Sequence, residues 1–332
     1  MGGSLSVNAH GRYVGQGPLV LAVKSILLVL ADGSMVEASP TQNSELFYGA
    51  IGGYGGIGVI AEATLALTEN TRLARKTEVM PVEQYRRFFA EQVRGNPDMV
   101  MHNGILYTDD YRTVRAVSYL RTDAPLTVEE RLVDAERNYK VMRAALGAAS
   151  SKSGAALREA VLDPLNFRGE QVQWRNHEAS LDVRELQPIS GADYSYVLQE
   201  YFVPEAQLEV FIARMRDVLQ KHRVKVANIS IRHAKADPGT LLAWSRGDTF
   251  ALVLYYRQGT SEEARAAVGT WTRELIDAAL ASDGTYYLPY QIHATREQFL
   301  AAYPRAPEYF ALKQRVDPTG KFRNKLWDAY YR

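Results

Sequence analysis

The sequence predicts an α+β protein with two parts, and two observations carry this prediction. Between residues 194 and 290, hydrophobic periodicity follows the order β-α-β-β-α-β, the ferredoxin-like arrangement of an antiparallel sheet with both helices on one face. Residues 1–60 instead combine a hairpin with two glycine-rich segments. The 332 residues are 46% hydrophobic and 23% charged, which is typical of a globular protein and argues against disorder or a polytopic membrane protein.

Charge and composition exclude several classes of site. The net charge of +1 argues against a general nucleic-acid binder. Because the chain contains no cysteine, disulfides, thiolate metal sites and cysteine nucleophiles are excluded. The six histidines show no metal-ligand spacing, so we expect no metal. Twenty tyrosines against ten phenylalanines suit the wall of a site for a polar organic ligand.

Residues 19–31 form an apolar run that could be mistaken for a signal peptide. Lys24 interrupts the run, no basic cap precedes it, and it is too short to cross a bilayer. We therefore expect no membrane span and a cytoplasmic location. Two strands explain the run better, over residues 25–31 and 34–38, with Asp32-Gly33 as a two-residue hairpin turn.

Periodicity predicts the remaining elements in chain order. Before residue 150 they are a helix over 44–50, strands over 59–67 and 72–80, a helix over 82–93, a hairpin over 103–120 and a charged helix over 128–146. Residues 150–192 are polar and irregular, and they predict no element. The later elements are strands over 194–203, 226–232, 249–257 and 285–290, and helices over 204–222 and 262–281.

The strand over residues 226–232 separates two kinds of side chain, because alternate residues point to opposite faces. The apolar set, expected to contact the helices, is Ala227, Ile229 and Ile231. The polar set, expected on the open face, is Asn228, Ser230 and Arg232. Such a face either covers a ligand or is an ordinary solvated surface.

Residues 53–58 read Gly-Tyr-Gly-Gly-Ile-Gly, which matches the pattern G-x-G-x-x-G. A Rossmann fingerprint needs a strand before it and a helix after it, whereas here the predicted order is reversed, so we reject an NAD site. Two interpretations remain: a bare backbone that approaches a flat or phosphorylated ligand, and a glycine-rich turn without a ligand. Gly2-Gly3 and His10-Gly11 have the same character, with His10 either a donor or base at a site or a structural residue.

Together these segments resemble the vanillyl-alcohol-oxidase type of FAD-dependent oxidoreductase, whose FAD-binding domain also occurs in p-cresol methylhydroxylase (the PCMH type). Residues 2–11 resemble its second flavin loop, residues 46–60 its closing helix, glycine loop and strand, and residues 317–324 its returning tail. Within the family, decaprenylphosphoryl-ribose oxidase resembles the chain most, and residues 229–237 resemble the alditol and gulonolactone oxidases. The resemblance implies a partial FAD-binding domain over 1–72 and 291–332 and a ferredoxin-like substrate or cap domain over 73–290.

The resemblance also implies a reaction and the residues that carry it. A secondary alcohol of a sugar, polyol or sugar-like glycoside would be oxidised by hydride transfer to FAD, with Arg232 stabilising negative charge on the substrate oxygen. The FAD-binding residues would be Gly2, Gly3, Val7, Asn8, Ala9, His10, Gly53, Gly58, Ile60 and Tyr287. The catalytic residues would be His10, Arg232, Tyr287 and Tyr290. The substrate contacts would be Asn228, Ser230, Arg232 and Tyr255.

The chain departs from the family pattern at three points. Ser230 stands where the sugar-alcohol oxidases have a glutamate, so a carboxylate partner is expected to be missing. Tyr290 stands about where the ribose oxidase has a lysine. The N-terminal subdomain with the first phosphate-binding loop is expected to be missing. The alternative function is therefore a silent remnant, or half of a split flavoprotein, that binds a ligand or a partner chain without FAD. The expected partners are a small-molecule, sugar-like substrate and either a second copy of the chain or the missing N-terminal half.

Overall fold

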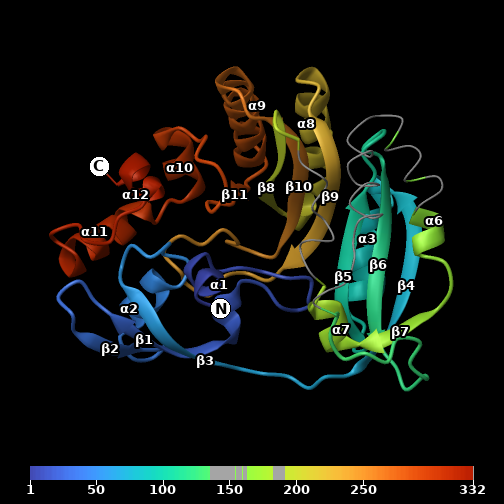
Figure 1. Cartoon of the computed structure of the whole chain (residues 1–332), viewed down its shortest axis with the longest axis horizontal. Helices are drawn as coiled ribbons and strands as arrows, with labels where there is room; N and C mark the ends of the chain where they lie inside the picture. Colours follow the sequence, from blue (N-terminus) through green and yellow to red (C-terminus); the bar gives the residue numbers. More distant parts are fainter. Residues whose placement is uncertain (135–153, 155–158, 160–162, 182–190, 332) are drawn as a thin grey trace.

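The computed structural model describes residues 1–134, 154, 159, 163–181 and 191–331. These residues fold around two antiparallel sheets, one of three strands and one of eight (Figure 1). The predicted mixture of helices with antiparallel sheets is confirmed. Among the described residues, no helix combines the length and the apolar composition needed to cross a membrane.

The smaller sheet has the strand order β2-β1-β3. Its strands are β1 (Val23–Val29), β2 (Met35–Ala38) and β3 (Val59–Leu65). The predicted hairpin is confirmed, because Val29 at the end of β1 lies opposite Met35. Its turn has three residues, one more than predicted. The backbone N–H of Gly33 donates to the carbonyl of Leu30, and the N–H of Leu30 donates to the carbonyl of Ser34. Gly33 has a φ of +88°, so it provides the left-handed residue that such a three-residue turn requires.

Short helical segments and the glycine loop lie beside this sheet. They are α1 (Gly2–Ser6), the 3-10 turn η1 (Leu19–Ala22) and α2 (Ser44–Ala50). The helix α2 has the predicted bounds, and the glycine-rich residues 52–58 lead from it into β3 as predicted.

The larger sheet has the order β11-β8-β10-β9-β5-β6-β4-β7. Its later half consists of β8 (Tyr194–Pro204), η5 (Glu205–Gln207), α8 (Leu208–Lys221), β9 (Lys225–Ala234), β10 (Thr249–Gly259), α9 (Glu262–Leu280) and β11 (Thr285–Tyr286). The order β11-β8-β10-β9 is that of a ferredoxin-like sheet, so the predicted arrangement is confirmed. The strand expected over residues 285–290 ends early, at Tyr286. Pro289 has no N–H to donate to a neighbouring strand.

The earlier half repeats this arrangement, although the sequence shows no repeat. It consists of β4 (Arg72–Pro81), α3 (Val82–Phe88), the π-helical turn η2 (Phe89–Arg94), β5 (Met99–Leu106), β6 (Thr113–Arg121), α6 (Asp163–Asn166), β7 (Gln171–Trp174) and α7 (Arg175–Ala179). Its order β7-β4-β6-β5 is again ferredoxin-like, and the halves meet where Ile105 of β5 lies opposite Ser230 of β9. Arg86 of α3 pairs with Glu209 of α8 at 3.0 Å, which places these helices on one face.

The charged helix predicted over residues 128–146 is wrong over 128–134, which are not helical. The backbone N–H groups of Thr127 and Val128 both donate to Val172 of β7, which ties this stretch to the edge of the sheet. The rest of that predicted helix lies outside the described residues. The predicted hairpin over 103–120 is confirmed by β5 and β6.

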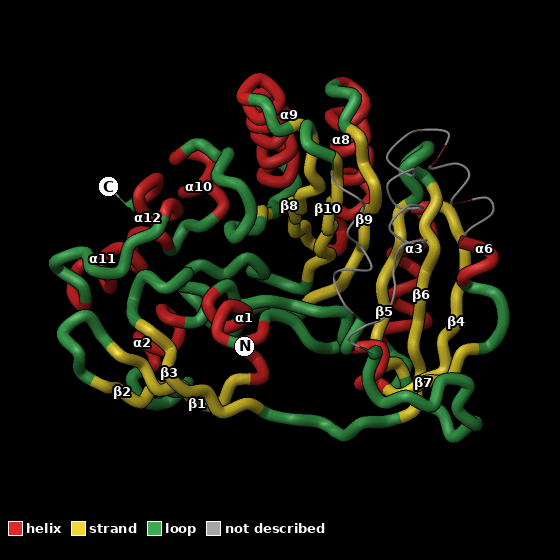
Figure 2. Tube along the Cα trace, in the orientation of Figure 1, coloured by secondary structure: helices red, strands yellow, loops and turns green. Residues whose placement is uncertain are grey.

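Residues 12–17 lie between the two halves of the larger sheet, where β5 and β9 separate. His102 of β5 donates its N–H to the carbonyl of Arg12, and Lys235, just after β9, donates to Gln16. The N-terminal segment is therefore held by both halves, and Figure 2 shows it crossing toward β5 and β6.

The C-terminal helices return to the glycine loop, beside the smaller sheet (Figure 1). They are α10 (Arg296–Ala302), α11 (Ala306–Val316) and α12 (Lys325–Tyr330). Tyr309 donates to the carbonyl of Gly53 at 2.7 Å, and Asn324 donates to that of Tyr54 at 2.8 Å. The sheets divide between β3 and β4; the domain boundaries at 72 and 291 stay predictions.

Candidate active site

The candidate active site lies on the open face of the larger sheet. Ile229 and Ile231 of β9 are fully buried on the helical face, whereas Ser230 and Arg232 are half-buried on the other. The predicted separation of this strand into two faces is therefore present. Asn228 is also half-buried there, and it pairs with Tyr255 of β10.

Glu200 of β8 is the centre of this site, and the sequence analysis did not identify it. The carboxylate lies 2.5 Å from Nε2 of His10, and each of these side chains is only 3% exposed. The hydroxyl of Tyr290 donates to the other carboxylate oxygen at 3.3 Å. Glu200 and Ser230 lie in one cross-strand row, each opposite Val253. A carboxylate therefore lies on the same face as Ser230, contributed by β8 and not by β9.

A signal for Glu200 was present in the sequence. It is the one acidic residue in the strand predicted over 194–203, where the neighbouring residues are mostly apolar or aromatic. A carboxylate in the middle of a strand that a sheet covers on both edges is rarely buried without a partner.

Arg232 has no hydrogen-bond partner among the described residues, and its Nε atom is buried. Burial lowers the pKa of Arg232, and Arg12 acts in the same direction, whereas the carboxylate of Glu200 raises it. A buried donor without a partner costs about 1–3 kcal/mol, more when it is charged, so a bound oxygen acceptor would remove this cost.

His10 is enclosed by aromatic rings. The ring centroids of Trp244, Phe202 and Tyr287 lie 4.9, 5.6 and 6.1 Å from that of its imidazole. Burial raises the pKa of Tyr287, and the carboxylate of Glu200 raises it further, so this phenol stays neutral. Three of the four predicted catalytic residues, His10, Tyr287 and Tyr290, thus gather around Glu200, and Arg232 lies within its electrostatic influence.

Aromatic side chains also fix the N-terminal loop through its backbone. Tyr287 donates its hydroxyl to the carbonyl of Val7, and Trp244 donates its indole N–H to that of Asn8, each at 2.9 Å. The side chain of Asn8 bonds Asp237 and the backbone of Val20. Asn8 is fully buried with a φ of 51°, so its polar groups are used within the protein.

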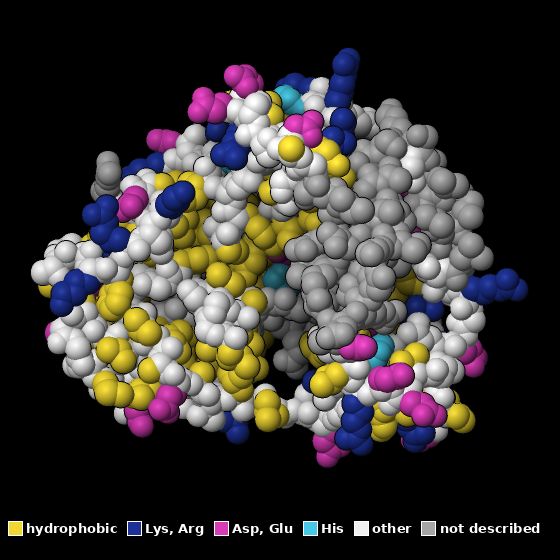
Figure 3. All heavy atoms as spheres, viewed as in Figure 1, with side chains coloured by type: hydrophobic (Ala, Val, Ile, Leu, Met, Phe, Trp, Pro, Cys, Tyr) yellow, Lys and Arg dark blue, Asp and Glu magenta, His cyan; other side chains and the backbone are white. Residues whose placement is uncertain are grey.

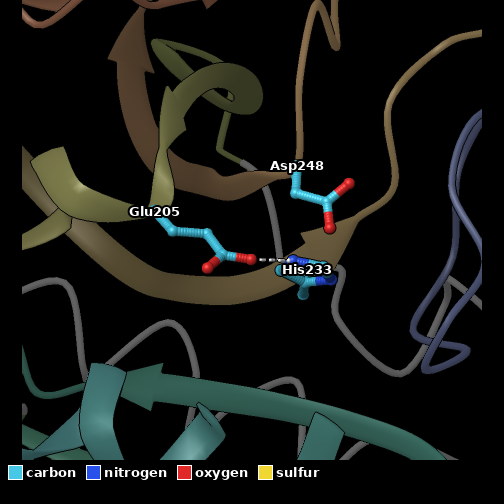
Figure 4. A group of neighbouring side chains, drawn as sticks. All are labelled: Glu205, His233 and Asp248. Atoms are coloured by element: carbon cyan, nitrogen blue, oxygen red, sulfur yellow. Dashed lines mark hydrogen bonds and ion pairs between the residues drawn. The ribbon is translucent and has the colours of Figure 1, made fainter.

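One group elsewhere in the described residues has the composition of a metal site. Glu205, His233 and Asp248 bring one ligand atom each within 4.8 Å of one another (Figure 4). Glu205 already pairs with Arg94 and with His233, and Asp248 pairs with Lys235 at 2.6 Å. Since both carboxylates are neutralised by side chains, this group is an ion-pair network.

Comparison with known proteins points to flavin-linked oxidases. Residues 188–330 match the family model described as D-arabinono-1,4-lactone oxidase. An alditol oxidase from Streptomyces sp. (strain IKD472 / FERM P-14339) is 27% identical over 97% of this chain and 71% of its own length. A mitochondrial L-galactono-1,4-lactone dehydrogenase 2 from Oryza sativa subsp. japonica is 32% identical over 33% of this chain, which is 18% of that protein.

Structure comparison agrees in fold. The crystal structure of cholesterol oxidase from B. sterolicum matches all of this chain and 74% of its own, with a TM-score of 0.69 and 12% identity. These similarities support the resemblance of the chain to the vanillyl-alcohol-oxidase type of FAD-dependent oxidoreductase. The expectation that decaprenylphosphoryl-ribose oxidase is the nearest member stays a prediction. The matched lengths also show that the chain spans only part of several relatives.

The similar proteins bind FAD, so the glycine-containing segments were compared with what a flat group of this kind would need. Gly2 and Gly3 are exposed, and a Cβ added to either would meet no atom within 4 Å. The glycine-rich loop over residues 52–58 lies beside helix α1. The backbone N–H of Gly52 donates to the carbonyl of Leu5, and that of Tyr54 donates to the carbonyl of Ser6. In the space-filling view, hydrophobic side chains gather around this part of the molecule (Figure 3).

The later glycines are needed by the protein itself. A Cβ on Gly53 would lie 2.0 Å from the carbonyl of Gly49, and one on Gly58 would lie 2.7 Å from that of Val29. Ile60 is half-buried in β3. Three backbone carbonyls in the N-terminal segment already accept hydrogen bonds: those of Val7, Asn8 and Ala9, the last from the N–H of Leu19. A cofactor would therefore contact this stretch through apolar atoms. The FAD contacts predicted for these residues stay predictions.

Proposed function

We propose that the chain acts in an FAD-dependent oxidoreductase that oxidises a secondary alcohol of a sugar, polyol or sugar-like glycoside. One observation carries this proposal: the unpartnered guanidinium of Arg232 stands near the His10–Glu200 pair on an open sheet face, and His10 belongs to the N-terminal segment that begins with the exposed Gly2 and Gly3. Buried polar groups without partners concentrate at sites that a ligand completes.

The residues divide the work as follows. Bound FAD would supply the acceptor for the hydride that leaves the alcohol carbon. Arg232 would donate to the substrate oxygen and stabilise the negative charge that develops there. Asn228, Ser230 and Tyr255, on the same face, would bind the remaining hydroxyl groups.

Absorbance spectroscopy and flavin reduction test the proposal. The purified chain is mixed with FAD, separated from free FAD, and exposed without oxygen to a panel of polyols, aldoses and aldonolactones. We expect a yellow protein whose flavin absorbance near the long-wavelength maximum is lost with at least one compound. A colourless protein that takes up no FAD would instead support the silent remnant.

Arg232 gives the sharpest single variant. Because its guanidinium would act on charge that develops during the reaction, Arg232→Ala should lower the rate of flavin reduction at least tenfold, which corresponds to about 1.4 kcal/mol. Arg232→Lys keeps the charge without the planar donor set and should recover only part of the rate. A rate for Arg232→Ala within tenfold of the parent contradicts the assigned role.

A further inference from the structure

We infer that Glu200 removes the substrate hydroxyl proton through Tyr290, so that the two side chains work as one proton relay. This inference rests on the proposed function. It assigns the base that alcohol oxidation needs, at a position where no carboxylate is expected from the sequence.

The two side chains of the proposed relay differ in their exposure to solvent. Tyr290 is half-buried, whereas the side chain of Glu200 is 3% exposed. The Tyr290 side chain is therefore the more accessible of the two on this face. The hydroxyl of Tyr290 already donates to Oε2 of Glu200 at 3.3 Å, which is the direction in which its proton would travel.

Tyr290 is a carrier and not the final acceptor. Burial raises the pKa of Tyr290, and Glu200 raises it further, so the phenol keeps its proton at neutral pH. A neutral phenol can pass a proton on only if it gives up its own, and the carboxylate beside it is the group that can receive it.

The surroundings of Glu200 hold it in place from several elements. Oε1 lies against Nε2 of His10 from the N-terminal loop, and the backbone carbonyl accepts from Tyr287, just after β11. The charged or titratable groups that face it are His10, Arg232, Tyr287, Tyr290 and Tyr303. Arg232 supplies positive charge near this carboxylate.

The proton and electron balance is simple. The proton of the substrate O–H moves to the Tyr290 oxygen while the phenol proton moves to Oε2 of Glu200. Bound FAD would accept the hydride with the electron pair of the carbon–hydrogen bond, and the substrate carbon and oxygen would be left joined by a double bond. Tyr290 ends as it began, and Glu200 ends as the neutral acid.

Single-turnover reduction of the FAD-loaded chain tests the relay, with the most active compound of the panel as substrate. We expect Glu200→Gln and Tyr290→Phe each to lower the rate about 100-fold, within the usual range for losing a positioned acid or base. The double variant should be no more than about threefold slower than the slower single variant, because the two groups act as a unit.

A matched control separates the relay from general damage to the sheet face. Glu178 is also a carboxylate with 3% exposure, but it pairs with Arg12 at 2.6 Å in the other half of the sheet. Glu178→Gln should keep the parent's rate within about threefold. FAD content and thermal unfolding, measured on every variant, show that each one is folded.

The outcomes distinguish the inference from the proposed function. A parent chain that binds FAD but is reduced by no alcohol overturns both. A parent that is reduced, with Glu200→Gln unchanged in rate, overturns the relay alone. Strictly additive losses in the double variant also overturn it. If Glu200→Gln does not fold, Tyr290→Phe still decides, because a rate within threefold of the parent leaves no role for the phenol.

Discussion

His102 and Arg232 are both buried titratable residues of the larger sheet, but only one has its hydrogen bonds satisfied. His102 Nε2 bonds the hydroxyl of Tyr85 and Nδ1 bonds that of Ser118, each at 2.9 Å. Arg232 lacks such partners within the described part of the chain. At the scale of single residues, this difference is the reason to assign His102 to folding and to propose Arg232 for ligand binding.

His102 makes the stability of the protein depend on pH. Burial lowers the pKa of His102 to about 3, whereas an unfolded histidine titrates near 6.5. Between these values the unfolded chain binds a proton that the folded chain excludes, so stability is complete above about pH 6.5 and falls with decreasing pH by about 1.4 kcal/mol per unit. Burial lowers the pKa of His233 as well, and that residue adds a slope of the same sign.

Denaturant unfolding between pH 4.5 and 6.5 measures this slope. His102→Gln should reduce it by about 1.4 kcal/mol per pH unit, whatever the variant's absolute stability. An unchanged slope would show that His102 is protonated in the folded protein.

At the scale of elements, the local sequence pattern predicts helices and strands well, but it predicts poorly the segments that pair with the edge of a sheet. The helix α2 and the alternation of β9 follow from periodicity that involves only neighbouring residues. The start of the predicted 128–146 helix fails because Thr127 and Val128 give their N–H groups to Val172, a partner more than 40 residues away. Competition of this kind leaves no trace in a short window of sequence.

The glycine loop gives a prediction at the same scale. A Cβ on Gly56 would lie 2.2 Å from the Tyr309 hydroxyl and 2.6 Å from the Trp327 indole nitrogen, so Gly56→Ala must displace the C-terminal helices. We expect a loss of about 3 kcal/mol or more of unfolding free energy, or no soluble protein. Gly95→Ala is the control, since a Cβ there meets open space at a φ of −86°. Equal stability of the two variants, measured by urea unfolding, would contradict the close contact.

At the scale of the whole molecule, Lys313 ties the C-terminal helices to the glycine loop. It donates to the carbonyl of Gly56 at 2.9 Å and pairs with Asp317 at 3.0 Å, and both charged side chains are essentially fully buried. Lys313→Met leaves the carboxylate of Asp317 without its cation and should cost about 3–5 kcal/mol. Lys313→Met with Asp317→Asn should recover part of this loss. Thermal unfolding compares the three proteins, and a single variant as stable as the parent would refute the role of the pair.

The active site also belongs to the whole molecule, which is why the sequence revealed it only in part. His10 and Glu200 are 190 residues apart, and the strand that carries Glu200 reaches His10 only through the fold. The resemblance of short motifs was enough to select His10, Arg232, Tyr287 and Tyr290. It did not select Glu200, because the family pattern places its carboxylate at the position of Ser230. That Glu200 of β8 lies in the same cross-strand row as Ser230 of β9 is visible only in three dimensions.

The position of residues 12–17 between β5 and β9 has a mechanical consequence. His10 is carried by a segment anchored to both halves of the sheet, whereas Glu200 belongs to one half alone. A rotation of one half against the other would therefore pull on the segment that follows His10, while the imidazole itself is held by rings of the later half. A guest molecule that bridges the halves would lock their angle, and with it the alignment of the groups that act on that guest.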